Sequence, residues 1–283
     1  MPPRSNPTAR QVRLGAELRK MRERTGMTAR EAARRFGISP MQMSHVEVGR
    51  IGIGEERLRV LAGHYGCTDE ALVDALVAMT GRQGRGWWEK YRGVIDSLTL
   101  DVAELEHHAV ALKAIQVVHV PGLLQTEPYM RALFTYLSPG YAPDRLEAVI
   151  EFRMRRRQVL ERAHPLPFEA VVHEAALRMK VDGDKVAREQ LDFILECSER
   201  PGVTIRVIPF AADRFAGMGC SMLYAEGLVP QLDTVQIDQV HGSVFIDGEA
   251  ELDHYRDRLR TMERSALSPE ATRDFIQRIA REM

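Results

Sequence analysis

Two pairs of polar residues near the amino terminus have the spacing that closes the first turn of a helix by hydrogen bonds. Thr28 stands three residues before Glu31, and Ser39 stands three residues before Gln42. At this spacing the hydroxyl accepts a hydrogen bond from the backbone N–H of the later residue, whose side chain accepts one from the earlier backbone in return. The two pairs therefore predict the starts of two short helices that follow each other closely in the chain.

The residues between these two starts predict a tight turn. Gly37 supplies a backbone position without a Cβ. Pro40 falls at the first position of the second helix, where no N–H is needed. Two capped helices separated by a glycine turn, within an arginine-rich segment, are typical of a helix-turn-helix that binds DNA. We therefore expect residues 26–47 to form such a motif.

Charge is distributed unevenly along the 283 residues. The chain has a net charge of −1, but residues 1–64 carry 13 lysines and arginines against 6 acidic residues, a net of +7, and the remainder carries a net of −8. Clustered positive charge attracts a polyanion. This distribution predicts that double-stranded DNA contacts the amino-terminal part of the chain.

Apolar residues at helical spacing predict a compact all-α domain of five helices over residues 8–80. Leu14, Leu18 and Met21 recur with the period of a first helix. Thr68 precedes the fifth helix and has a side chain suited to cap it. Together the five short helices are expected to enclose one apolar core.

Spaced positions in this domain form a recognisable pattern. They are Leu18, Arg19, Arg22, Gly26, Met27, Thr28, Glu31, Gly37, Ile38, Ser39, Ser44, Glu47, Gly49 and Arg50. The pattern, which covers residues 10–79, resembles that of the lambda-repressor-like, xenobiotic-response-element regulators. The resemblance implies that the third helix lies in the major groove of DNA. It also implies a structural ion pair between Arg22 and Glu47 that joins the first and third helices.

The same resemblance, carried over by position, implies which residues meet DNA. Those expected at or near base edges and flanking phosphates are Ser39, Met41, Gln42, Ser44 and His45, and those expected against the backbone are Ala29, Arg30 and Arg50. Gln42 can pair bidentately with adenine, Met41 can contact a thymine methyl group, and His45 can donate to guanine or to a phosphate. For Met41, exposure to solvent without any contact is an equal alternative. Arg50 is expected to hold a phosphate, which carries little sequence information.

The rest of the chain predicts a connector and a second domain of a different class. Three glycines in residues 81–86 predict a flexible hinge. Strands are predicted at 115–120, 168–172, 203–208, 221–224 and 234–237, and helices near 126–137, 143–162, 184–199 and twice after 248, the last beginning at Ser268. We therefore expect residues 87–283 to form a mixed α/β domain for regulation and dimerisation. The order of its strands does not follow from the sequence.

A second pattern begins at the string Val120-Pro121-Gly122-Leu123-Leu124-Gln125-Thr126-Glu127. It continues through Tyr129, Arg156, Gln158, Leu160, His173, Glu174, Leu177, Gln190, Leu191, Val207, Pro209, Phe210, Ala266, Leu267 and Ser268. Over roughly 85–283 this pattern resembles the carboxy-terminal domain of streptomycete antitoxin-like regulators. The resemblance implies an actinobacterial regulator, often encoded beside a small acidic partner protein, and names no ligand.

Two functions follow from these observations and remain open. The first is a homodimeric transcriptional regulator that reads a palindromic operator through the helix at 39–48, because two such helices can occupy half-sites about 34 Å apart. A small-molecule effector or a protein bound to the carboxy-terminal domain would modulate it. The second is an antitoxin-like protein that neutralises a small partner protein and regulates its own operon.

The sequence offers little support for catalysis. The histidines are dispersed without zinc-ligand spacing, and there is no phosphate-binding glycine loop or nucleophile elbow. The adjacent residues His173 and Glu174 suggest a metal ligand pair, but ordinary polar roles explain them better. We therefore expect no enzymatic activity, no cofactor and no metal site.

Two further expectations concern charge and location. Arg153, Arg155, Arg156 and Arg157 are expected to form a solvated or salt-bridged helix face, with a contact to DNA or an acidic partner as the alternative. Three scattered cysteines, a start without an apolar core and the lack of a membrane-length apolar run predict a cytoplasmic protein with no signal peptide and no membrane contact.

Overall fold

The computed structural model describes residues 3–80, 86–213, 221–239 and 242–283. Contacts divide the chain into two compact units. The amino-terminal unit comprises residues 1–89 with 228–231, and the carboxy-terminal unit comprises residues 90–227 with 232–283. The hinge expected at 81–86 lies, apart from Gly86, outside the described residues.

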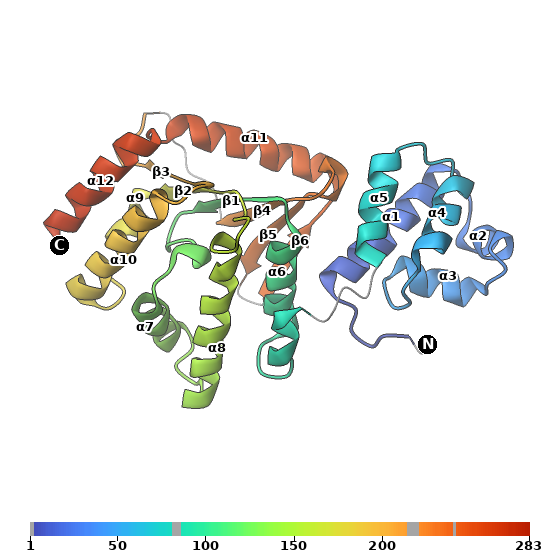
Figure 1. Cartoon of the computed structure of the whole chain (residues 1–283), viewed down its shortest axis with the longest axis horizontal. Coiled ribbons are helices and arrows are strands. Elements are labelled where there is room, and N and C mark those ends of the chain that lie inside the picture. The colour runs from blue at the N-terminus through green and yellow to red at the C-terminus, as the bar shows by residue number, and fades with distance from the viewer. Residues whose placement is uncertain (1–2, 81–85, 214–220, 240–241) are drawn as a thin grey trace. The chain divides into compact units, whose positions relative to one another are not determined.

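The amino-terminal unit is all-α, as the sequence predicts. Its helices are α1 (Ala9–Arg24), α2 (Ala29–Arg35), α3 (Pro40–Glu47), α4 (Glu55–His64) and α5 (Glu70–Thr80), shown in blue to cyan in Figure 1. One residue from each of several helices is almost fully buried, including Leu18 on α1, Met43 on α3 and Leu58 on α4. Apolar side chains buried between the helices therefore hold α2 to α5, which have 11 residues or fewer and would be marginal alone in water.

Both predicted capping boxes are confirmed. The backbone N–H of Glu31 donates to Thr28 Oγ1 at 3.2 Å, and the N–H of Thr28 donates to Glu31 Oε2 at 2.8 Å. The equivalent distances for Ser39 and Gln42 are 3.1 and 2.9 Å. These reciprocal bonds satisfy the backbone donors that the first turn of a helix leaves without partners, so α2 and α3 begin where the sequence predicts.

The other caps differ from expectation. A third capping box, between Thr8 and Gln11, begins α1. At α5 the cap is Asp69 and not Thr68, because the N–H of Leu72 donates to Asp69 Oδ1 at 3.0 Å. Thr and Asp are both good capping residues, and their adjacency makes the sequence signal ambiguous by one residue.

Two glycines let α1 pass very close to the end of α3. A Cβ on Gly15, in the middle of α1, would lie 2.6 Å from the carbonyl oxygens of both Val46 and Glu47. A Cβ on Gly49 would lie 2.6 Å from the carbonyl oxygen of Gln11, and Gly49 also has a φ of +75°. Glycine inside a helix costs about 1 kcal/mol relative to alanine. Backbone packing therefore decides the residue at position 15, against local helix propensity.

The carboxy-terminal unit is built on a six-stranded sheet with the order β3-β2-β1-β4-β5-β6. The strands are β1 (Ala111–Gln116), β2 (Phe168–His173), β3 (Val203–Ile208), β4 (Met222–Glu226), β5 (Thr234–Gln239) and β6 (Gly242–Ile246). The first three strands run parallel to one another. From β4 onward each strand is antiparallel to its neighbour. The sheet thus changes from parallel to antiparallel pairing between β1 and β4.

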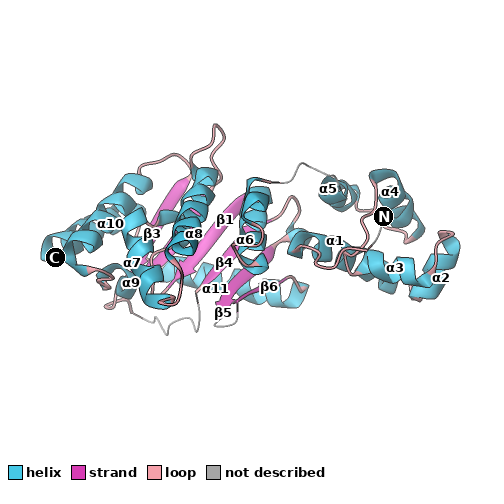
Figure 2. Cartoon of the chain, turned by 90° about the horizontal axis from the view of Figure 1, so that it is seen from below, coloured by secondary structure: helices cyan, strands magenta, loops and turns pink. Residues whose placement is uncertain are grey.

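Helices cover both faces of this sheet. They are α6 (Ser97–His108), α7 (Glu127–Leu137), α8 (Pro143–Arg156), α9 (Glu174–Arg178), α10 (Gly183–Ser198), α11 (Glu249–Ser265) and α12 (Pro269–Glu282). Figures 1 and 2 show α6, α7, α8 and α10 on one face and α11 on the other. Neighbouring residues of β1 divide between the two apolar cores, since Ala114 belongs to the core on the α8 side and Ile115 to the core beneath α11. The mixed α/β class is confirmed.

Two strand assignments needed correction. The first strand was predicted at 115–120, but β1 is Ala111–Gln116, and the chain leaves the sheet before Pro121. Ala, Leu and Lys at its start are helix formers, yet Leu112 pairs with Phe168 in the ladder. Tertiary pairing overrides their propensity. Strand β6 was not predicted, because it is a half-buried edge strand with weak alternation of apolar residues.

The close approach of α1 to α3 leads to a test in which two glycines respond in opposite ways. Changing Gly15 to Ala should destabilise the amino-terminal unit by about 1–3 kcal/mol, because the methyl group overlaps backbone oxygens. Gly63 on α4 has nothing within 4 Å of an added Cβ, so Gly63→Ala should stabilise by about 0.5–1 kcal/mol. Native-state hydrogen exchange of amides in residues 9–80 measures both changes. Stabilisation by Gly15→Ala would contradict the packing.

Candidate nucleic-acid interface

Helix α3 has one buried and one exposed face. Met43 and Glu47 point into the unit, with exposed fractions of 1% and 7%. Met41, on the opposite face, is 69% exposed. Gln42 and Ser44 are also exposed. A short helix anchored along one side and open along the other has the form that a major groove accepts.

The remaining predicted residues lie around this open face. Ser39, the cap of α3, is exposed, and His45 is half-buried in the last turn of the helix. Ala29 is half-buried at the first position of α2, and Arg30 beside it is exposed. Arg50 is exposed in the loop that follows α3. The eight residues therefore belong to one continuous helix-turn-helix segment, and their contacts with DNA remain a prediction.

The structure adds three cations to this segment that the sequence reasoning left out. Arg34 and Arg35 are exposed in the last turn of α2, and neither forms a hydrogen bond or ion pair within the described residues. Arg4 joins them from the chain start, because its N–H donates to the carbonyl oxygen of Arg50 at 2.9 Å. Its guanidinium donates to the carbonyl of Gly49 at 3.0 Å. The positive charges of Arg34 and Arg35 next to the predicted turn are the sequence signal that could have identified them. Arg4 has no such signal, because its position near Arg50 depends on contacts between distant parts of the chain.

Gln42 has two competing uses. Its Oε1 accepts the N–H of Ser39 in the capping box at 2.9 Å. A bidentate pair with adenine needs both that oxygen and the amide nitrogen Nε2. The cap and a base would therefore share Oε1, whose second lone pair is the one left for a base, while Nε2 donates without this competition.

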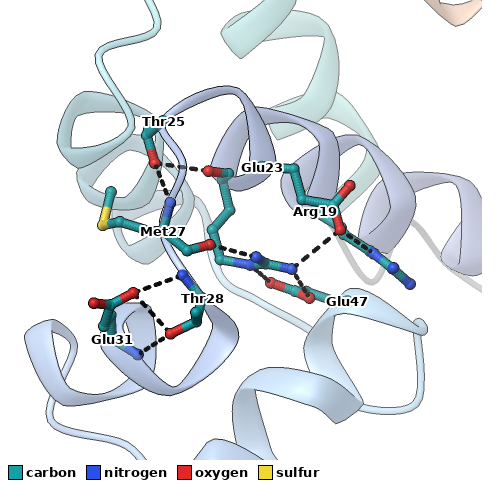
Figure 3. A network of polar contacts seen from close by, with 8 residues as sticks. Arg19, Glu23, Thr25, Met27, Thr28, Glu31 and Glu47 are labelled. Atoms are coloured by element: carbon teal, nitrogen blue, oxygen red, sulfur yellow. Dashed lines mark hydrogen bonds and ion pairs between the residues drawn. The ribbon is translucent and has the colours of Figure 1, made fainter.

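A buried ion pair fixes the position of α3. The Arg22 guanidinium on α1 donates from Nε to Glu47 Oε1 at 2.6 Å and from Nη2 to Glu47 Oε2 at 2.9 Å. Its Nη1 donates to the carbonyl oxygen of Met27 at 2.6 Å, just before α2. Figure 3 shows Glu47 and Met27 at the centre of this network. The hydrogen bond to Glu47 is the main cause of the raised pKa of the Arg22 guanidinium. The expected ion pair between Arg22 and Glu47 is therefore confirmed.

This network links three helices. Arg22 and Glu47 are only 6% and 7% exposed, so their mutual attraction is weakly screened by water. Close beside them, the N–H and hydroxyl of Thr28 lower the pKa of the Glu31 carboxylate. The end of α1, the start of α2 and the end of α3 are thus joined by charged hydrogen bonds, which hold the open face of α3 in place.

The described residues of both units contain no group of three or more His, Cys, Asp and Glu side chains that could hold a metal ion. The His173 and Glu174 pair serves local structure, since His173 Nδ1 accepts from the N–H of Ala175 at 3.2 Å and Glu174 Oε2 accepts from that of Phe210 at 2.7 Å. Within the same part of the chain, every helix is too short or too polar to cross a bilayer.

Comparison with known proteins agrees with this division. Residues 13–76 match a helix-turn-helix domain, and residues 99–278 match a domain of unknown function, DUF5753. The chain belongs to the DUF5753 family. No curated protein and no solved structure matches it. The helix-turn-helix domain indicates a DNA-binding regulator, and the DUF5753 domain carries no assigned activity.

The buried ion pair leads to a prediction about how this DUF5753 protein holds α3 in place. Changing Glu47 to Gln removes the buried counter-charge of Arg22 and leaves only the half-exposed Glu23, whose Oε1 lies 3.5 Å from Arg22 Nη2. The change should cost about 3–5 kcal/mol of unfolding free energy. The double change Arg22→Met with Glu47→Leu should recover most of this loss, because no charge is then stranded. Hydrogen exchange within residues 9–80 measures the effect.

The exposed pair Arg19 and Glu23 provides the control, with side chains 57% and 50% exposed. Arg19→Gln should leave stability unchanged, because an ion pair in water contributes little. The single variants Arg22→Met and Glu47→Leu complete the comparison. A loss of stability in the double variant equal to the sum of their two losses would contradict the coupling between Arg22 and Glu47.

Proposed function

We propose that this protein is a sequence-specific transcriptional regulator of the bacterial cytoplasm that binds a palindromic operator as a homodimer. A ligand or protein bound to the carboxy-terminal unit modulates it. The observation that carries the proposal is the exposed face of α3, held by the buried Arg22–Glu47 pair. Specificity by DNA-binding proteins depends on presenting such a face rigidly to base edges. We propose no catalytic activity.

The proposed contacts divide by chemistry. Gln42, Ser44 and His45 offer hydrogen-bonding groups toward base edges or nearby phosphates, and Met41 offers an apolar surface to a thymine methyl group. The hydroxyl of Ser39 and the start of α2 at Ala29 lie beside the phosphate backbone of the DNA. The cations proposed to bind phosphates are Arg30, Arg34, Arg35 and Arg50, which are exposed and lack ion-pair partners within the described residues. Phosphate contacts supply affinity and orientation, whereas base contacts supply specificity.

Gln42 is the residue at which base reading can be separated from folding. Changing Gln42 to Glu keeps a side-chain oxygen for the capping box, since Ser-x-x-Glu is a favourable box, but removes the amide donor. We expect unchanged helix stability and a loss of about 1–3 kcal/mol in operator binding, with relaxed preference at one base pair. Gel-shift titration against a panel of single-base operator variants measures this.

Arg50 provides the contrast in the same assay. Arg50→Ala should weaken binding to specific and to random DNA to the same extent. It should also reduce the slope of log affinity against log salt concentration by about 1. The negative charge that Gln42→Glu introduces weakens binding to all DNA, so the role of Gln42 is measured by the additional loss on the operator. No additional loss on the operator over random DNA would contradict its proposed role in base reading.

Dimerisation is proposed from the size of the DNA-binding unit. A single domain of this kind buries about 600–1,000 Å² of protein surface on DNA, and two such domains on half-sites about 34 Å apart reach the affinity of an operator. Sedimentation of the full chain with a duplex operator should give two chains per duplex. Tight, specific binding of one chain per duplex would overturn the homodimer.

An antitoxin-like role is the second candidate, and one observation favours it. Tyr136 and Leu137, at the end of α7, are 82% and 53% exposed. Adjacent exposed apolar side chains are a common feature of protein interaction sites. If this role is correct, the product of a neighbouring gene co-purifies with the full chain in fixed stoichiometry, and Tyr136→Ser with Leu137→Ser releases it. Purification of the chain without such a product would leave the regulator as the proposed function.

A further inference from the structure

Two arginines of α8 converge on one small volume in the carboxy-terminal unit. A Cβ built on Gly122 would lie 3.6 Å from Arg153 Nη1 and 3.9 Å from Arg156 Nη2. Both guanidinium groups therefore border the space in front of the Gly122 backbone. Gly122 and Arg153 are half-buried, so this space is reached from solvent.

The two arginines differ in how their charges are balanced. Arg156 is 9% exposed and forms a two-point ion pair with Glu106 of α6, at 2.6 and 2.9 Å. Arg153 lies over the ring of Phe134, 4.3 Å from its centroid. Within the described residues Arg153 has no hydrogen bond and no ion pair. The expected salt bridge is thus confirmed for Arg156. The expectation of a solvent-exposed side chain is wrong for both Arg153 and Arg156, because Arg153 is half-buried and Arg156 is buried.

Carboxylates near Arg153 act on its charge only from a distance. Its burial, together with the charge of Arg156, lowers the pKa of Arg153 to about 10. Asp238 of β5 and Glu106 of α6 are near enough to favour the charged form. Glu106 is hydrogen-bonded to Arg156, and Asp238 Oδ1 accepts from Gln236 Nε2 at 2.6 Å and from Ser243 Oγ at 2.9 Å. The guanidinium donors of Arg153 thus have no acceptor within the described residues, and an anion in direct contact would supply one.

The place of this volume in the sheet also points to a ligand. Gly122 lies in the loop that follows the carboxyl end of β1. Strand β1 is parallel to β2 on one side and antiparallel to β4 on the other. In open α/β sheets ligands bind outside the carboxyl ends of parallel strands, where the strand order changes direction. Asp238 and Ser243 are paired in the ladder of β5 and β6 next to this end.

We propose that Gly122, Arg153 and Arg156 form a binding site for an anionic group, a carboxylate or a phosphate, of a small effector molecule. Guanidinium groups bind both anions through paired hydrogen bonds. Gly122 leaves the space that the anion occupies, and Glu106 keeps Arg156 oriented toward it. The regulatory role of the site rests on the proposed function, whereas the binding itself is a property of the carboxy-terminal unit.

The repulsion between Arg153 and Arg156 has a consequence for the ligand-free protein. Residues that serve binding commonly reduce the stability of the unliganded fold. Changing Arg153 to Met removes the repulsion from Arg156 and retains a long apolar side chain over Phe134. The unfolding temperature of the ligand-free full chain should therefore rise or stay the same. A purely structural arginine would give a lower unfolding temperature on substitution.

Thermal unfolding of the full chain tests binding directly. Inorganic phosphate and succinate are titrated separately, with chloride at matched ionic strength as the reference. At saturation at least one of the two anions should raise the unfolding temperature by about 2–4 °C beyond chloride. Arg153→Met should abolish this rise, and Gly122→Ala should weaken the apparent affinity at least tenfold, because its methyl group enters the site without changing charge.

Arg145 provides the matched control on the same helix. It is exposed, and eight residues of helix separate it from Arg153, about 12 Å along the axis. Arg145→Gln removes the same charge and should leave the anion response unchanged. A response to phosphate alone would identify a phosphorylated effector, and a response to succinate alone a carboxylate effector, both in support of the site.

Several results would overturn the proposal: no response to either anion beyond chloride, an undiminished response in Arg153→Met, or an equal loss in Arg145→Gln. Operator gel shifts on the same variants keep this result separate from the proposed function. Arg153→Met without any anion should bind operator DNA as the wild type does. A wild-type protein that binds the anion but no DNA would contradict the regulator and leave the anion site standing.

Discussion

The buried ion pair between Arg22 and Glu47 is the interaction on which the DNA-binding unit depends. Glu47 is the last residue of α3, so its carboxylate ties the end of that helix to α1. The same guanidinium holds the carbonyl of Met27, immediately before α2. One cation therefore sets the relative position of three helices. A buried pair of this kind is a poor source of net stability but a strong determinant of geometry, because every alternative packing strands a charge.

Glycine completes the same constraint from the opposite side. Gly15 and Gly49 allow backbone contact between α1 and the end of α3, at a separation that any Cβ would prevent. The ion pair and the backbone contact act on the same helix end, one by electrostatic attraction and one by close packing. The exposed residues of α3 are consequently presented by a helix that has little freedom to shift. That rigidity makes specific base reading by so short a helix physically reasonable.

The two units use arginine in contrasting ways. In the amino-terminal unit Arg30, Arg34, Arg35 and Arg50 are exposed cations without ion pairs among the described residues, which suits contact with phosphates. In the carboxy-terminal unit Arg156 is buried against Glu106, and Arg153 is half-buried beside it. A partly buried arginine can be reached only by a small anion, whereas exposed arginines on a helix-turn-helix can contact an extended polyanion. The same side chain is thus matched to ligands of different size.

Local signals in the sequence determined the starts of α2, α3 and α12, the helix-turn-helix and the class of each domain. Thr28, Ser39 and Ser268 cap helices through hydrogen bonds to residues three positions away, so a short window of sequence contains the whole interaction. The strand order, the shifted position of β1 and the edge strand β6 depended on pairing between distant segments. The convergence of Arg153 and Arg156 on Gly122 likewise joins residues from separate elements. Only the tertiary structure decides such contacts, because their partners lie far apart in the chain and no local pattern specifies them.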